Sequence, residues 1–295
     1  MADSRFDFAS IGAYTKDTIV SAAGTRHVNG GGYSYAAHAA LLSGLQVAAV
    51  TRLAREDLGS TDLLRSSGVQ VIVHESPTST LMRLEYPTAN VDERILSVAA
   101  VAEPFGVQHV RGVDARALLI TASIRGEVPL EVVQELRGRD ALLALDVQGF
   151  VRIVGEGGRL QYAQWPEMRA VLGLIDILKT DAVEAGFLTG ETDIHAAARK
   201  LQSYGPKEIV LTHKDGLLVL AQGREHAAGF HPRELRGRSG RGDTCVGSYA
   251  ARRLSADPAD ATRWAAAVTS LKLEAEGPVR RTREDVDTLL RTRYA

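Results

Sequence analysis

Residues 238–247 read RSGRGDTCVG, and this stretch carries the strongest structural signal in the chain. Gly240 and Gly242 flank one residue, Asp243 follows at once, and a helical pattern begins near Thr244. The first N–H groups of a helix lack intrahelical acceptors and lie at the positive end of the helix dipole. A glycine turn at this point therefore favours a bound anion, phosphate above all. A carboxylate cannot itself bind phosphate, so we interpret Asp243 as a base that takes a proton beside a phosphoryl group.

Composition limits the class of protein. A chain of 295 residues with 45% hydrophobic content can bury a large core, and we expect one domain over residues 1–295. The net charge of −1 provides no field for nucleic acid, and the sequence has no apolar run long enough for a membrane helix. The single cysteine, Cys245, excludes an internal disulfide framework and a cysteine zinc site. We expect a cytoplasmic protein with neither nucleic acid nor membrane as a partner.

Short apolar strands alternate with helical segments along most of the chain, which predicts a mainly parallel sheet covered on both faces. The expected fold class is α/β with three layers, α/β/α. Two segments fall outside this pattern: period-two alternation over 78–100 indicates a hairpin, and residues 14–20 continue extended after the first strand. We interpret them as a small β-lid formed by about 13–28 and 76–102. Strands are expected at 6–12, 47–51, 69–74, 117–122, 141–147, 174–178, 208–212 and 217–221, and helices at 33–42, 56–67, 130–136, 166–172, 182–188, 194–204, 244–254, 258–275 and 283–292.

Several motifs together resemble those of the ribokinase-like (PfkB) carbohydrate kinases. Residues 240–243 are similar to the family's G-A-G-D signature, with Arg241 at the position of the alanine. The pair at 31–32, followed by a helix, resembles the family's N-terminal di-glycine element, although Ala36 stands where an asparagine is common. Residues 181–184 resemble its N-x-x-E element, with Asp181 in place of asparagine. The resemblance spans nearly the whole chain and implies the same α/β/α core with a β-lid.

The resemblance also implies roles for individual residues in catalysis and acceptor binding. Asp243 corresponds to the base that activates the acceptor hydroxyl, and the backbone amides around it correspond to the hole that holds the transferring phosphate. Asp17 corresponds to an acid that grips two hydroxyl groups of the acceptor, although a solvated turn residue is the alternative. The anion hole comprises Gly240, Arg241 and Gly242, and the substrate-binding residues are Asp17, Gly31, Gly32 and Gln148.

The same resemblance implies ATP and Mg²⁺ as cofactors. Asp181 and Glu184 share one side of a helix start, where two carboxylates suit a hydrated Mg²⁺. Their spacing is equally that of a capping box, and both interpretations stay open. The residues expected to bind ATP are Lys179, Thr212, Lys214, Gly216, Ala266 and Ser270.

These observations lead to one functional hypothesis, an ATP-dependent kinase that phosphorylates a hydroxyl of a small sugar or polyol, in a subgroup similar to inositol kinases. A nucleoside kinase of the same fold and a non-catalytic ligand-binding protein on a kinase scaffold are the alternatives. One face of the alternating hairpin is apolar and needs a partner. The resemblance implies that paired lids bury this face, so we expect a homodimer through the lid.

Overall fold

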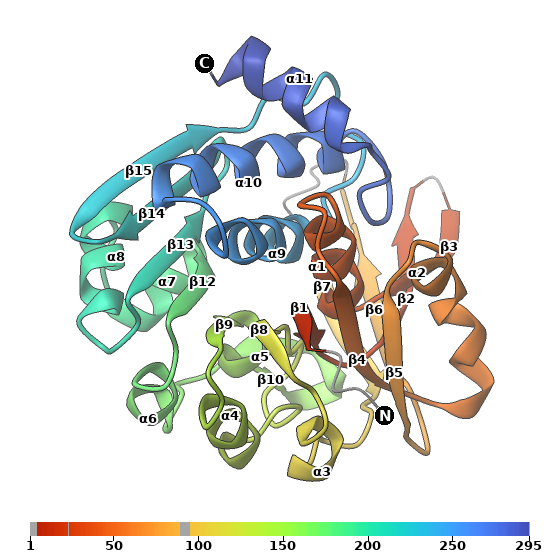
Figure 1. Ribbon diagram of the computed structural model, residues 1–295. Helices are drawn as coiled ribbons and strands as arrows, with labels where there is room; N and C mark the ends of the chain where they lie inside the picture. Colours follow the sequence, from red (N-terminus) through yellow and green to blue (C-terminus); the bar gives the residue numbers. More distant parts are fainter. Residues whose placement is uncertain (1–4, 23, 89–94, 295) are drawn as a thin grey trace.

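The computed structural model describes residues 5–22, 24–88 and 95–294, and a nine-stranded sheet lies at its centre (Figure 1). Neighbouring strands run parallel from β5 to β13, and β14 and β15 complete one edge in antiparallel pairing. The predicted mainly parallel sheet is therefore confirmed. In spatial order the strands are β15 (Arg224–Gly229), β14 (Gly216–Ala221), β13 (Glu208–Thr212), β12 (Ile177–Asp181), β9 (Leu142–Asp146), β8 (Ala115–Ile120), β1 (Phe6–Ile11), β4 (Val47–Leu53) and β5 (Gln70–Glu75).

Helices cover both faces of this sheet, which explains why every residue of β4 is buried and no polar alternation interrupts it. On one face lie α1 (Gly32–Leu41), α2 (Asp62–Ser66), α9 (Arg241–Arg253) and α10 (Pro258–Leu273), with α11 (Arg283–Arg293) packed on α10. On the other lie α3 (Val107–Val110), α4 (Leu130–Arg137), α5 (Gln148–Val151), α6 (Met168–Leu172), α7 (Ala182–Thr189) and α8 (Ile194–Gln202). Within the described ranges, no helix combines the length and apolar character needed to cross a membrane.

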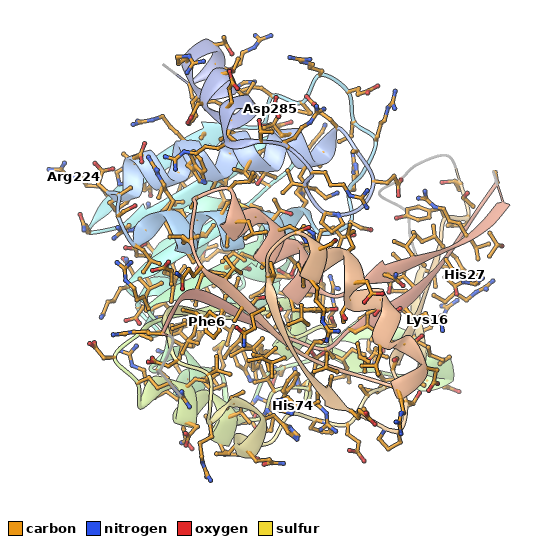
Figure 2. All side chains as sticks on the ribbon, turned by 45° about the vertical axis from the view of Figure 1, so that its right-hand side comes forward. Phe6, Lys16, His27, His74, Arg224 and Asp285 are labelled. Atoms are coloured by element: carbon orange, nitrogen blue, oxygen red, sulfur yellow. The ribbon has the colours of Figure 1, made fainter. Side chains whose placement is uncertain are left out.

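A separate four-stranded sheet forms the lid, with strand order β3-β2-β6-β7. Figure 2 labels Lys16 and His27 on its first two strands, which project from the core. The hairpin's apolar side, with Leu84 and Leu96, lines a cavity in the same chain. The homodimer stays a prediction, and residues 89–92 of the turn expected at 87–92 lie outside the described residues. The strands are β2 (Thr15–Ser21), β3 (Gly24–Gly30), β6 (Thr80–Glu85) and β7 (Ile95–Ala100).

Most expected elements match to within two residues at each end, and α9 begins at Arg241 rather than 244. Two others differ in kind or position. The helix expected at 56–67 is a 3₁₀ helix, Arg55–Thr61, followed by the short α2. Gly59 lies inside it, and glycine is a poor helix former. Strand β12 begins at Ile177 rather than 174, because the carboxylate of Asp176 turns to accept the N–H of Leu143 on β9, at 3.0 Å. Elements missed from the sequence are α3, α5, β15, β10 (Arg152–Val154), β11 (Leu160–Tyr162) and a second 3₁₀ helix (Glu156–Gly158).

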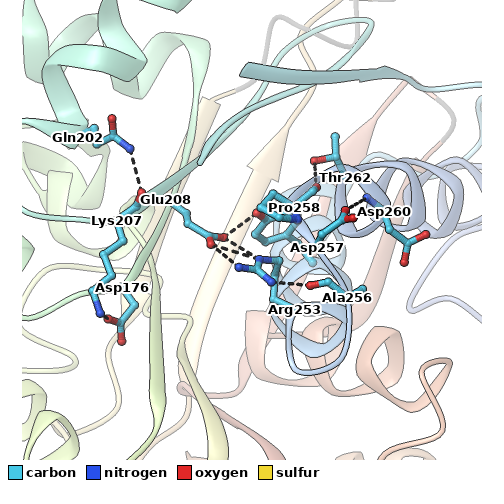
Figure 3. A network of polar contacts seen from close by, with 11 residues as sticks. Asp176, Gln202, Lys207, Glu208, Arg253, Ala256, Asp257, Pro258, Asp260 and Thr262 are labelled. Carbon is cyan, nitrogen blue, oxygen red and sulfur yellow. Dashed lines mark hydrogen bonds and ion pairs between the residues drawn. The ribbon is translucent and has the colours of Figure 1, made fainter. Parts of the chain in front are cut away.

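A polar network fixes the C-terminal end of α9 (Figure 3). Glu208 begins β13, and its carboxylate accepts hydrogen bonds from Arg253 at 2.7 Å and from the Tyr249 hydroxyl at 2.6 Å. Asp257 then caps α10 by accepting the N–H of Asp260 at 2.8 Å. The C-terminal end of α9 is anchored where β13 starts. The N-terminus of α9 therefore lies toward the carboxyl ends of the parallel strands.

Candidate active site

A cavity of about 260 Å³ lies between the ends of the parallel strands, the N-terminus of α9 and the lid. In sheets of this kind ligands bind outside the carboxyl ends of the strands. The cavity brings together most of the residues that the sequence analysis selected. Those lining it are Asp17, Gly31, Gly32, Gln148, Lys179, Asp181, Thr212, Gly240, Arg241, Gly242 and Asp243.

The glycine turn is shaped by two close approaches. Gly240 caps α9 in the left-handed region, with φ of 74°, and a Cβ atom there would lie 2.1 Å from the Tyr35 ring. A Cβ atom on Gly242 would lie 2.5 Å from the amine of Lys179. A side chain at Gly240 would clash with the Tyr35 ring and one at Gly242 would displace the Lys179 amine, so both glycines line the cavity with backbone alone.

Asp243 lies where the N-termini of two helices converge. Its Oδ1 atom lies so close to Gly32, at the start of α1, that a Cβ atom there would be 2.3 Å from it. This contact explains why the second residue of the di-glycine element is glycine: a side chain there would clash with Asp243. Burial raises the pKa of the Asp243 carboxyl above its usual value, and the ammonium group of Lys179 opposes that rise. A carboxylate with a raised pKa accepts a proton more readily, as a general base must.

Behind the turn lies a buried group of charges from neighbouring strand ends. The amine of Lys179, on β12, is 3.1 Å from Asp146 Oδ2 on β9 and 3.9 Å from Glu184 Oε2. Arg152 lies 3.8 Å from the other oxygen of Glu184. Burial acts to lower the pKa of Lys179, yet these carboxylates hold it above its ordinary value, so the ammonium stays charged. A fixed positive charge thus lies directly beneath the glycine turn at Gly240 and Gly242.

The end of the cavity toward the lid has a polar wall on one side and an apolar wall on the other. Asp17 is half-buried, and its buried Oδ1 atom has no hydrogen-bond partner among the described residues. Burial raises the pKa of this carboxyl to about 6. An unsatisfied carboxylate at the cavity wall can accept hydrogen bonds from a ligand. The apolar wall comes from lid side chains: Met82, Leu84, Tyr86 and Leu96.

The two carboxylates predicted to hold magnesium cap their own helix. Asp181 accepts the N–H of Glu184 at 2.8 Å, and Glu184 accepts the N–H of Asp181 at 2.9 Å, which is a reciprocal capping box. Asp181 lines the cavity, whereas Glu184 is fully buried behind it against Lys179 and Arg152. The described residues hold no cluster of three or more potential metal ligands. Asp181 alone of this pair is therefore placed to face a hydrated cation.

The structure brings only two of the predicted ATP-binding residues, Lys179 and Thr212, to the cavity wall. Lys214 is exposed on the turn between β13 and β14. Gly216 begins β14, where a Cβ atom would lie 2.3 Å from the carbonyl oxygen of Ala228, so its conformation serves strand pairing. The ATP roles of these two residues are thus not supported by their positions.

Ala266 and Ser270, expected to border the adenine, are fully buried. The Tyr294 hydroxyl lies 3.1 Å from Ser270 Oγ and donates to the carbonyl of Gly229 at 2.7 Å. The backbone N–H of His231 donates to the same serine oxygen at 2.8 Å, and its ring lies 5.2 Å from that of Tyr294. Side chains of the protein thus occupy the surface on which a base was expected.

Other cavity residues were missed from the sequence. Tyr35 follows the di-glycine element on α1, and Ser123 follows β8. Glu127 holds the backbone of Ser123 in place. Its buried carboxylate accepts the N–H group of Ser123 at 2.9 Å and that of Ala13 at 2.6 Å. A polar residue after a buried strand is the signal that would have found Ser123.

Comparisons with known proteins agree with this geometry. The family model described as pfkB family carbohydrate kinase matches residues 8–284. One solved structure, a pyrophosphate-dependent kinase in the ribokinase family complexed with a pyrophosphate analog and myo-inositol, is 32% identical with a TM-score of 0.88, and the match covers 95% of this chain and 99% of that chain. A pyrophosphate-dependent myo-inositol-1 kinase converted into a myo-inositol-3 kinase is also 32% identical, with a TM-score of 0.87 over 98% of this chain and 100% of that chain.

Ribokinase from Arabidopsis thaliana, complexed with ribose and ATP, is 19% identical with a TM-score of 0.76, and the match covers 97% of this chain and 99% of that chain. At that identity the likeness concerns the fold alone. No curated protein matches the chain.

Proposed function

The chain belongs to the pfkB family of carbohydrate kinases and is a phosphotransferase acting on a sugar or polyol hydroxyl; from this premise we propose that its donor is pyrophosphate and its acceptor a cyclic polyol. The donor proposed here is smaller than the ATP expected from the family resemblance alone. The observation that carries it is the filled surface beside Ser270, described above.

A nucleotide donor needs room for a base and a ribose in addition to its phosphates. Tyr294 covers Ser270 and is held by hydrogen bonds to Ser270 and Gly229, so an adenine would have to displace this side chain and break both contacts. Such a displacement leaves buried polar groups unpaired, at a cost of about 1–3 kcal/mol for each group. Pyrophosphate needs no such room.

The phosphate end of the cavity suits a compact, highly charged donor. Lys179, Arg238 and Arg241 line it beside the first turn of α9. Cationic side chains and helix N-terminal N–H groups together match the oxygens of a diphosphate. The relative complexed with a pyrophosphate analog and myo-inositol supports the same class of donor.

The acceptor end supports a ring that carries hydroxyl groups on its edge. Asp17 and Gln148 supply polar contacts at this end, while Leu84 and Leu96 supply an apolar wall from the lid. A cyclic polyol presents C–H groups on its ring faces and hydroxyl groups around its rim, so it complements both surfaces. We therefore take myo-inositol, the acceptor named for two relatives, as the first compound to test.

In the proposed reaction, Asp243 accepts the proton of the acceptor hydroxyl as that oxygen bonds to a phosphorus atom of pyrophosphate. The bridging P–O bond breaks, and orthophosphate leaves with the electron pair. The amides of the first turn of α9 and the ammonium of Lys179 stabilise the charge on the transferring group, which is where phosphoryl transfer gains most of its rate. Closure of the lid over the cavity excludes water and limits hydrolysis of the donor.

Magnesium is part of the proposal, with Asp181 as the residue that holds it through water. A magnesium ion bound with the donor would neutralise charge on the phosphate oxygens. Glu184 contributes indirectly, since it fixes the backbone of Asp181 and balances the charges of Lys179 and Arg152.

The test is a comparison of initial rates with pyrophosphate and with ATP, each with myo-inositol, other cyclitols, hexoses, pentoses and nucleosides. We expect turnover with pyrophosphate and a cyclitol, and a much lower kcat/KM with ATP. Tyr294→Ala should raise kcat/KM for ATP, while Tyr204→Ala, a tyrosine on the opposite face at the end of α8, should not. A wild-type enzyme that prefers ATP would overturn the proposed donor.

A further inference from the structure

One buried cation near the anion-binding turn has no part in the chemistry described so far. Lys272 lies one residue before the end of α10, and only 1% of its surface is exposed. Its amine donates a hydrogen bond to the carbonyl of Gly237 at 2.8 Å and lies 5.6 Å from the centre of the Tyr35 ring. Burying an ammonium group is costly unless its partners repay the lost hydration, so its position requires an explanation.

The carbonyl that Lys272 binds belongs to the segment leading into the turn. The N–H groups of Arg236 and Gly237 both donate to the carbonyl of Leu273, at 2.9 and 3.1 Å. A Cβ atom on Gly237 would lie 2.1 Å from the carbonyl oxygen of Ala275, so the segment is pressed against the end of α10. These contacts fix the chain three residues before Gly240, which caps α9.

Lys272 is also linked to the turn at Gly240 by the ring of Tyr35, which lies between them. The Tyr35 side chain lies against Gly240 on one side and within cation–π distance of the Lys272 amine on the other. We propose that Lys272 is a positioning residue for phosphoryl transfer, whose tethered ammonium holds both the segment before the anion-binding turn and the ring behind it. This inference rests on the proposed function in that it assigns the turn to a transferring phosphoryl group.

The surroundings of the amine predict how it titrates. Burial lowers the pKa of Lys272 to about 8, while Glu276 and Asp243 oppose that shift. Glu276 follows α10 and is paired with Arg26 of β3 at 2.9 Å, and Arg236 and Arg238 line the same side from the loop. Loss of the proton above pH 8 removes the charge that holds the segment, so we expect kcat to fall as pH rises through this range.

The contribution of Lys272 to the free energy of unfolding should rise over the pH range in which kcat falls. The pKa of Lys272 is lower in the folded protein than in the unfolded chain, where it is about 10.4. Above pH 8 the folded state therefore binds fewer protons than the unfolded state, and this group's contribution to the free energy of unfolding rises with pH. A decline of activity in this range thus cannot be assigned to loss of the fold through this residue.

The first test is Lys272→Met, which keeps the length of the side chain and removes its charge. Loss of one charge-assisted hydrogen bond predicts a fall in kcat of about 10- to 100-fold, with KM changed less. The alkaline limb of the kcat profile near pH 8 should disappear, and thermal stability should not fall. Lys207→Met, which removes an exposed lysine just before β13, is the matched control and should keep the wild-type profile.

Two further variants sharpen the test. Glu276→Gln removes the anion that raises the pKa of Lys272, so the alkaline limb should shift to lower pH. Lys272→Ala leaves space beside a cavity of about 370 Å³, and methylammonium should partly restore kcat while tetramethylammonium, which has no N–H donor, should not. A Lys272→Met enzyme with wild-type kcat and an unchanged alkaline limb would overturn the proposal.

The outcome is separable from that of the proposed function. If wild-type protein turns over no polyol with any donor, the proposed function fails, and amide hydrogen exchange over residues 236–243 still decides the role of Lys272. Faster exchange of these amides in Lys272→Met, compared with Lys207→Met, supports the positioning role. Unchanged exchange contradicts it.

Discussion

Replacing Asp243 by asparagine separates catalysis from stability, because the two should change in opposite directions. The variant keeps the size of the side chain and its place beside Gly32, so the cavity keeps its shape. It cannot accept the hydroxyl proton, and loss of a positioned general base lowers kcat by about 10²- to 10⁴-fold. This range corresponds to about 3–5.5 kcal/mol of transition-state free energy.

The stability of the same variant follows from the raised pKa of Asp243. A carboxyl whose pKa is higher in the folded state than in the unfolded state loses stability as pH rises through that interval, because the folded state holds its proton longer. At neutral pH the ionised group is destabilising, and each unit of raised pKa corresponds to about 1.4 kcal/mol. Asp243→Asn removes this penalty and should unfold at a higher denaturant concentration than wild type at pH 7, with the difference shrinking as pH falls toward 4.

The assay combines initial-rate measurements with urea unfolding at several pH values, with Asp140→Asn, an exposed aspartate at the far end of the sheet, as the control. Wild-type turnover by Asp243→Asn would refute the assignment of the base. A loss of activity accompanied by lower stability at pH 7 would refute the account of its pKa, since the defect would then be one of folding.

Four further outcomes follow from the contacts described. Acceptor KM should rise as pH falls through about 6, because protonation of Asp17 removes a hydrogen-bond acceptor; a flat KM between pH 5 and 8 would contradict this. Glu184→Gln should leave the magnesium concentration for half-maximal rate unchanged, and a rise in that concentration would restore Glu184 as a metal ligand. Leu84→Asp should raise acceptor KM, and we expect sedimentation of wild-type protein to give a homodimer that this substitution weakens; a fully active monomer would refute the dimer. Arg253→Met leaves Glu208 buried without its cation and should destabilise the fold by about 3–5 kcal/mol in urea unfolding, and a change below 1 kcal/mol would contradict the role of that pair.

The parts of the site that could be predicted from the sequence are those made by neighbouring residues. The turn at Gly240 and Gly242 and the acid after it form one local unit, so their spacing was sufficient to indicate an anion site. The di-glycine element and the capping box of Asp181 are local in the same sense. Apolar runs located most of the parallel strands, because a strand covered on both faces contains few polar residues.

The parts that could not be predicted depend on contacts between distant segments. Nothing in the pattern around Ser270 indicates that Tyr294, from beyond α11, covers it. The position of Lys179 beneath the turn, between Asp146 and Glu184, likewise requires the order of strands β9 and β12 in the sheet. The resemblance implies ATP, but the glycine turn is equally suited to any phosphate donor, so the choice of donor depends on these distant contacts.

The most direct test of the proposed function is ³¹P NMR of wild-type protein with pyrophosphate, magnesium and myo-inositol, with no nucleotide present. The account predicts a phosphomonoester resonance that grows together with an equal amount of orthophosphate and depends on the presence of myo-inositol. If no phosphomonoester forms from pyrophosphate while ATP with the same acceptor yields one, the proposed donor is wrong.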